Sequence, residues 1–211
     1  MKTDQLIAIL TADVEALPSR TWLKNLSLAA GTGLLMATAL MVIFLGVRPD
    51  WQQIAQHSWF WLRLGFPMVL SFAAFAGVLR LAQPGVALGL APLGILLPII
   101  LVLGMGAAQL LGAAPDTRTT MIFGNTWTDC LLFVSLLSLP AFVALQAVLR
   151  DLAPTRPVLA GAMAGLLSGA LAASAYAIHC PEMTVPFLVW YLLGMLVPAA
   201  LGALLGRQLR W

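Results

Sequence analysis

Six apolar runs of about 20 residues each restrict what this chain of 211 residues can fold into. At about 1.5 Å of helix per residue, each run matches a hydrocarbon core about 30 Å thick. The composition agrees, because 61% of the residues are hydrophobic and 9% are charged. We therefore expect an all-α integral membrane protein with six transmembrane helices. The runs are residues 26–47, 59–79, 88–111, 128–149, 158–178 and 187–206.

The Lys and Arg residues predict how these spans are oriented, because cytoplasmic loops are enriched in both. With the N-terminus in the cytoplasm, eight basic residues lie on the inner side and three on the outer side. Six spans then return the C-terminus to the cytoplasm. The net charge of +3 is explained by these flanking residues, so we expect no direct binding of nucleic acid. The inner set is Lys2, Arg20, Lys24, Arg80, Arg150, Arg156, Arg207 and Arg210, and the outer set is Arg48, Arg63 and Arg118.

Residues 1–25 form a cytoplasmic segment that precedes the transmembrane domain of residues 26–211, and we expect no cleavable signal peptide. Their apolar residues recur at helical spacing, which predicts a short amphipathic helix. Acidic residues occupy its polar face, whereas a lipid-surface helix usually carries Lys and Arg there. The pattern favours docking to a soluble partner, and packing onto the protein's own loops is the alternative. The apolar face consists of Leu6, Ile7, Leu10, Val14 and Leu17.

The two cysteines, Cys130 and Cys180, are both expected on the outer side, at the ends of the fourth and fifth spans. A short inner turn joins these spans and makes them antiparallel neighbours. The cysteines lie 20 and 23 residues from that turn, roughly 30 and 34 Å along each helix. The outer compartment permits thiol oxidation, and a small movement of the outer loop could close a disulfide.

His179 adjoins Cys180 and could activate its thiol or join it as a ligand of a soft metal. We therefore predict a small, exposed sensing site made of Cys130, Cys180 and His179. A transient metal site would add Asp129 or Glu182. The sequence leaves open whether the cysteines form a switch or a permanent disulfide, and whether His179 only caps its helix.

Enzymatic chemistry has little support in the sequence. The cysteines form no C-x-x-C pair, and neither a Ser/His/carboxylate spacing, a phosphate-binding loop nor an intramembrane carboxylate relay is present. We expect no catalysis and no cofactor. Arg63 is interpreted as an interfacial arginine without a function. Two other functions stay open, a small channel or transporter, suggested by the Pro and Gly residues of the third span, and a membrane tether that senses nothing.

Seven short motifs, spread over essentially the whole chain, resemble those of the NrsF family. Each cysteine lies in one of the two most specific motifs. The motifs are residues 1–7 (MKTDQLI), 46–50 (GVRPD), 124–130 (GNTWTDC), 136–140 (LLSLP), 154–157 (PTRP), 179–182 (HCPE) and 204–207 (LLGR).

The resemblance implies a six-span anti-sigma factor of the bacterial inner membrane. Such a protein keeps an extracytoplasmic-function (ECF) sigma factor of the sigma-F type away from RNA polymerase. The resemblance also implies that Cys130 and Cys180 matter for releasing the sigma factor under metal or oxidative stress. We accordingly expect the N-terminal apolar face to bind the sigma factor, and a change at the thiols to shift the fourth span against the fifth.

Overall fold

The computed structural model describes residues 21–47, 49–83, 85–182 and 184–208. In these residues all regular structure is helical, and six helical stretches are long and apolar enough to cross a membrane. This confirms the all-α expectation and the number of candidate spans. The helices are α2 (Thr21–Phe44), α3 (Trp51–Ile54), α4 (Ser58–Leu81), α5 (Ala91–Gly112), α6 (Pro115–Phe123), α7 (Trp127–Leu137), α8 (Leu139–Leu152), α9 (Pro157–Tyr176) and α10 (Leu188–Gln208).

The fourth candidate span is longer than predicted and is divided into consecutive helices. The stretch runs over 38 residues, Pro115–Leu152, and contains α6, α7 and α8. Pro140, at the start of α8, explains the break between α7 and α8. A proline cannot donate a backbone hydrogen bond, and its ring crowds the carbonyl four residues earlier. The hydroxyl of Ser138 donates to the carbonyl of Ser135 (2.6 Å) at this break.

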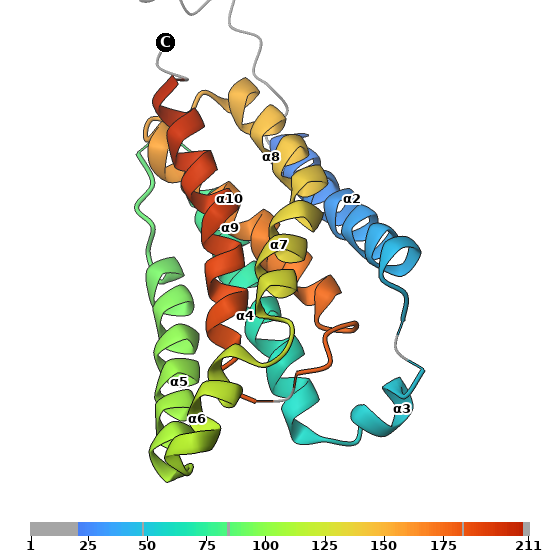
Figure 1. The fold of residues 1–211 in the computed structure, drawn as a ribbon. Coiled ribbons are helices and arrows are strands. Elements are labelled where there is room, and N and C mark those ends of the chain that lie inside the picture. Colours follow the sequence, from blue (N-terminus) through green and yellow to red (C-terminus); the bar gives the residue numbers. More distant parts are fainter. Residues whose placement is uncertain (1–20, 48, 84, 183, 209–211) are drawn as a thin grey trace, which may run out of the picture.

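α9 is the central helix of the bundle and packs mainly against α10 and α4, with α2, α7 and α8 as further neighbours (Figure 1). Its small residues allow the backbones to approach closely. A Cβ on Gly161 would collide with the backbone oxygen of Gly202, and a Cβ on Gly165 with that of Pro198. The Gly161-xxx-Gly165-xxx-Gly169 run of α9 therefore lies where the backbones of α9 and α10 approach each other closely.

α5 lies at the edge of the bundle and packs chiefly on α4 (Figure 1). Its buried residues are Ala91, Val102 and Gly106, and most of its large apolar side chains are exposed. A helix that exposes such a surface needs an apolar surrounding, which a lipid bilayer provides.

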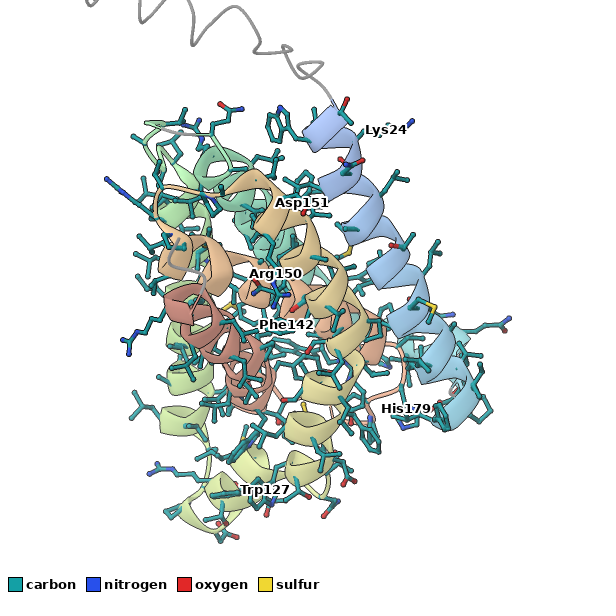
Figure 2. The ribbon with its side chains drawn as sticks, turned by 90° about the horizontal axis from the view of Figure 1, so that it is seen from above. Lys24, Trp127, Phe142, Arg150, Asp151 and His179 are labelled. Atoms are coloured by element: carbon teal, nitrogen blue, oxygen red, sulfur yellow. The ribbon has the colours of Figure 1, made fainter. Side chains whose placement is uncertain are left out.

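The two ends of the bundle differ in character. Lys24 and Asp151 lie at one end, and His179 and Trp127 at the other (Figure 2). The first end, here called the basic end, also receives Arg80, Arg150, Arg156 and Arg207 from the ends of α4, α8, α9 and α10. The opposite end, called the thiol end, contains α3, α6 and the connection between α9 and α10 (Figure 1).

Candidate thiol site

The connection between α9 and α10, residues 177–187, joins several elements of the thiol end. The Nδ1 atom of His179 lies 3.0 Å from the carbonyl oxygen of Gly46, just after α2. The hydroxyl of Thr184 donates to the carbonyl of Met121 in α6 (2.8 Å). The backbone N–H of Val185 donates to the side chain of Gln109 in α5 (3.3 Å). A displacement of this connection would therefore reach three other helical regions.

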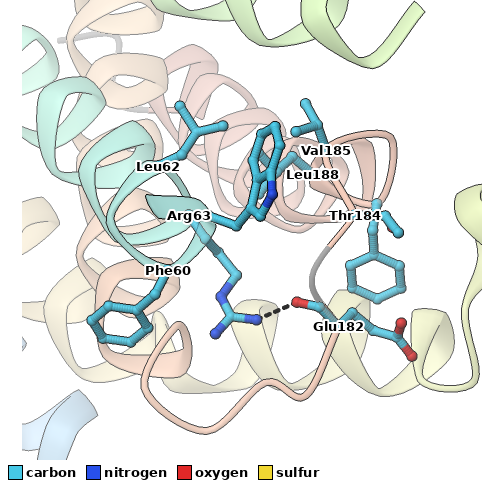
Figure 3. Close-up of a pocket in the computed structure, with 9 residues that line it drawn as sticks. Phe60, Leu62, Arg63, Glu182, Thr184, Val185 and Leu188 are labelled. Carbon is cyan, nitrogen blue, oxygen red and sulfur yellow. Dashed lines mark hydrogen bonds between the residues drawn. The ribbon is translucent and has the colours of Figure 1, made fainter. Parts of the chain in front are cut away.

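Glu182 links the same connection by hydrogen bonds to α4 and to the segment between α6 and α7. Its backbone carbonyl accepts a hydrogen bond from the Nη1 of Arg63 in α4 (Figure 3). Its side-chain Oε1 accepts one from the backbone N–H of Asn125, between α6 and α7 (2.9 Å). Gly124 allows this approach, because it has a φ of +53° and a Cβ there would lie 2.6 Å from the Cδ of Glu182.

Cys130 of α7 and Cys180 of this connection lie near each other. Cys130 lies in the first turn of α7, and Cys180 follows α9, with its N–H bonded to the carbonyl of Tyr176 (3.1 Å). Both are thiols rather than partners in a disulfide, and both side chains have 0% exposure. The two sulfur atoms are close enough to interact electrostatically.

The expectation of an exposed site is thus wrong. Both thiols are fully buried, and Val185 and Phe187 of the same connection are buried as well. The predicted position of both thiols at a common end of the antiparallel helices agrees with the structure. Their enclosure arises from contacts between residues that are far apart in sequence.

Aromatic rings surround the thiols. Tyr176 lies 5.9 Å from Tyr191 and 6.2 Å from Phe133, measured between ring centroids. The buried hydroxyl of Tyr191 lies beside Cys180 but makes no hydrogen bond of ordinary geometry with a described atom. Burial raises the pKa of the Cys180 thiol, and the positive charge of Arg63 opposes this effect. Cys180 therefore stays neutral at neutral pH.

The three other predicted metal ligands are exposed or have other hydrogen-bond partners. Asp129 is exposed, the ring of His179 faces the carbonyl of Gly46, and the carboxylate of Glu182 accepts from Asn125. Across the described residues, no three His, Cys, Asp or Glu side chains are grouped for a metal ion. The structure brings the two sulfur atoms together, and the transient metal site stays a prediction from the sequence.

Arg63 is the residue of this site that sequence reasoning missed. We interpreted it as an arginine extending to the membrane interface, but its side chain is only 5% exposed. The guanidinium lies 6.0 Å from the ring centroid of Phe60, and its buried Nε has no hydrogen-bond partner. The signal was its position inside an apolar run, where a charged residue is usually functional.

The predicted partner-binding face lies outside the described residues. Those residues are Leu6, Ile7, Leu10, Val14 and Leu17. The described structure begins at Thr21, the first residue of α2, at the basic end of the bundle.

Comparisons with known proteins cover almost the entire chain. A family model named NrsF, described as "Negative regulator of sigma F", matches residues 10–211. The "Probable anti-sigma-F factor NrsF" of Azospira oryzae is 43% identical over 213 residues, which span 100% of both chains. The "Anti-sigma-F factor NrsF" of Caulobacter vibrioides is 35% identical over 220 residues, again with 100% of both chains covered. No solved structure matches this chain.

Proposed function

Because the chain belongs to the NrsF family of negative regulators of sigma F, we propose that it is an anti-sigma factor that retains a sigma factor of the sigma-F type. The observation that carries this proposal is the full-length similarity to two proteins named anti-sigma-F factors. We take the sigma factor to be of the ECF class. The role is binding and release, for which no catalytic step is needed.

The proposed location is the bacterial inner membrane, with both termini in the cytoplasm. Six apolar helices support insertion. The orientation is supported by the basic end, which holds five of the described Lys and Arg residues, whereas Arg63 and Arg118 belong to the thiol end. The basic end would then face the cytoplasm and the thiol end the outer compartment.

The N-terminal segment is the proposed binding element for the sigma factor. Leu6, Ile7, Leu10, Val14 and Leu17 provide an apolar face suited to a groove on a soluble protein. The segment leads directly into α2 at the proposed cytoplasmic end. A partner bound there would be held beside the membrane.

The thiol site is the proposed sensor, in which Cys130 and Cys180 respond to metal or oxidative stress. Its support is the complete burial of both thiols and the many contacts of the connection that contains Cys180. Because both thiols are fully buried, a reagent that forms a new bond at either sulfur atom must displace the residues around it, this connection included. The movement would displace α7 relative to α9, as expected from the sequence.

α2 offers a route from the thiol end to the N-terminal segment. Its last turn is followed by Gly46, which His179 contacts, and its first residue is Thr21. A tenfold change in affinity for the sigma factor requires about 1.4 kcal/mol of coupling. The loss or rearrangement of one or two helix contacts can supply this amount.

The experiment that tests partner and binding element together is a pull-down from detergent. The full chain and a variant lacking residues 1–22 are each co-expressed with the sigma factor. We expect the full chain to retain the sigma factor and the shortened chain to lose it while still inserting into the membrane. Equal recovery with both chains would contradict the assignment of the N-terminal segment.

A small channel or transporter is the second candidate, favoured by the Pro and Gly residues of α5. The position of α5 at the edge of the bundle gives this idea little support, because a conducting path would require its polar backbone to face the interior. A tether without a sensor is a further alternative, for which the cysteines would be dispensable.

A further inference from the structure

Arg63 places a positive charge inside the thiol site. The residue lies on α4, its side chain is 95% buried, and it donates to the carbonyl of Glu182, two residues after Cys180. The close-up in Figure 3 shows the guanidinium directed at this carbonyl. The guanidinium group of an arginine carries a positive charge and five N–H donors.

Within the described residues, Arg63 forms no ion pair with a carboxylate. Within the described part of the chain, the contacts of Arg63 are the carbonyl of Glu182 and the ring of Phe60, and Nε is left unpartnered. The Glu182 carboxylate is engaged by the N–H of Asn125. A buried charge of this kind is costly unless it is paired, which indicates that it is kept for a purpose other than stability.

The charge acts on both sulfur atoms. Arg63 interacts electrostatically with Cys130 and with Cys180. The other charged groups that act on this pair are Asp129 and Glu182. Since Asp129 is exposed to solvent, its field is screened more strongly than that of the buried guanidinium.

We propose that Arg63 determines the charge selectivity of the thiol site: it favours anionic thiol-reactive species at Cys180, tolerates uncharged ones and disfavours cations. The inference rests on the proposed sensor function and narrows the chemical class of its stimulus. Like charges repel and opposite charges attract more strongly in the interior of a protein than in water. An approaching cation would meet the unneutralised guanidinium, whereas an anion would supply the missing counter-charge.

The test compares the rates at which three methanethiosulfonate reagents modify Cys180 in the purified full-length Cys130→Ser variant. The sulfonatoethyl reagent is anionic, the trimethylammonioethyl reagent is cationic and the methyl reagent is neutral. In each case the Cys180 thiolate attacks the sulfur atom of the reagent that carries the alkyl group. A mixed disulfide forms, methanesulfinate leaves with the bonding electron pair, and the thiol proton passes to the buffer.

We expect the anionic reagent to react faster than the cationic one. Arg63→Met should lower the ratio of the anionic to the cationic rate about tenfold, and Arg63→Lys, which keeps the charge, should largely preserve it. Arg118→Met is the matched control, because Arg118 donates a hydrogen bond to the carbonyl of Ala113, next to its own helix, rather than to the connection that contains Cys180. Its removal should leave the ratio unchanged.

A ratio that is the same in Arg63→Met and in the parent protein would overturn the proposal, as would a failure of Cys180 to react with all three reagents. Should Arg63→Met not fold, Glu182→Gln provides an independent test. The amide oxygen of the glutamine can still accept a hydrogen bond from Asn125. The substitution removes the negative charge beside Cys180, so the ratio of the anionic to the cationic rate should rise. A fall or no change would count against the proposal.

These rates are measured without a sigma factor. Failure of this proposal can therefore be distinguished from failure of the proposed anti-sigma function. The charge preference of Cys180 can be absent while the sigma factor is retained, and retention can fail while the charge preference is observed. The ratio also separates an electrostatic role of Arg63 from a purely structural one, because a loosened loop would speed up all three reagents together.

Discussion

The Nδ1 atom of His179 lies 3.0 Å from the carbonyl oxygen of Gly46, and this contact connects the thiol site to the end of α2. His179 directly precedes Cys180, and Gly46 follows the last turn of α2. α2 then extends over 24 residues, about 36 Å, to Thr21 at the opposite end of the bundle. The contact therefore joins the proposed sensor to the helix that continues from the proposed sigma-binding segment.

The first prediction is that His179→Ala weakens the response without abolishing retention of the sigma factor. The contact with Gly46 is lost, and a single hydrogen bond contributes about 1 kcal/mol, so stress-induced release should fall about fivefold. Release is measured as induction of a sigma-dependent reporter. His57→Ala is the matched control, because His57 precedes α4 at the same end and its side chain makes no capping bond. Equal responses of both variants would argue against a route through α2.

The second prediction concerns the thiols as one unit. Cys130→Ser and Cys180→Ser should each change stress-induced release, and the double variant should resemble the single ones, because coupled residues give non-additive effects. The same reporter measures all three. Normal induction in every variant would show that the cysteines are dispensable, as in the tether alternative.

The helices were predictable from the sequence because their signal is local. Apolar runs and short polar connections place α2, α4, α5, α9 and α10 within a few residues of the observed bounds. The run of small residues in α9 is likewise a local pattern, and it is typical of helices that pack closely. α3 and α6 were missed because they are short, and α6 has no buried residue whose spacing could reveal it.

The thiol site was predictable only in part. Cys130 and Cys180 could be assigned to one end of the bundle by counting residues along two helices. Their burial depends on contacts such as that between Arg63 and Glu182, which are 119 positions apart in the sequence. No periodicity or motif records such a contact, so both the enclosure and the role of Arg63 became visible only in three dimensions.

The third prediction tests the packing of α9 on α10. Gly165→Leu should destabilise the fold by about 3 kcal/mol or more, because even the first carbon of the new side chain would collide with the backbone of Pro198. Gly104→Leu, on the exposed side of α5, has no atom within 4 Å of the added carbon and should be tolerated. Thermal unfolding in detergent compares the two. Similar unfolding temperatures would contradict the observed helix contact.

The fourth prediction is a loss of stability at alkaline pH that depends on Cys180. Its pKa in the folded protein is raised above the ordinary thiol value of 9.0. Above pH 9.0 the unfolded chain therefore releases a proton that the folded chain still holds, and unfolding becomes more favourable as the pH rises through this range. The slope is at most about 1.4 kcal/mol per pH unit.

This pH dependence is measured as the difference between Cys130→Ser and the double variant Cys130→Ser/Cys180→Ser. The two should have parallel stabilities below pH 9.0 and diverge above it, where only the first loses stability through the Cys180 thiol. Parallel behaviour over the whole range would show that Cys180 is not held in its protonated form by burial.

The most direct test of the account measures where the sigma factor is found when the N-terminal apolar face is altered. Cells carrying the parent protein, Leu10→Asp or the polar-face control Thr11→Asp are separated into membrane and soluble fractions, and the sigma factor is quantified in each. We predict that Leu10→Asp moves most of the sigma factor to the soluble fraction, whereas the parent and Thr11→Asp keep it at the membrane. A sigma factor that stays at the membrane in Leu10→Asp, with the variant protein inserted at normal levels, would contradict the account.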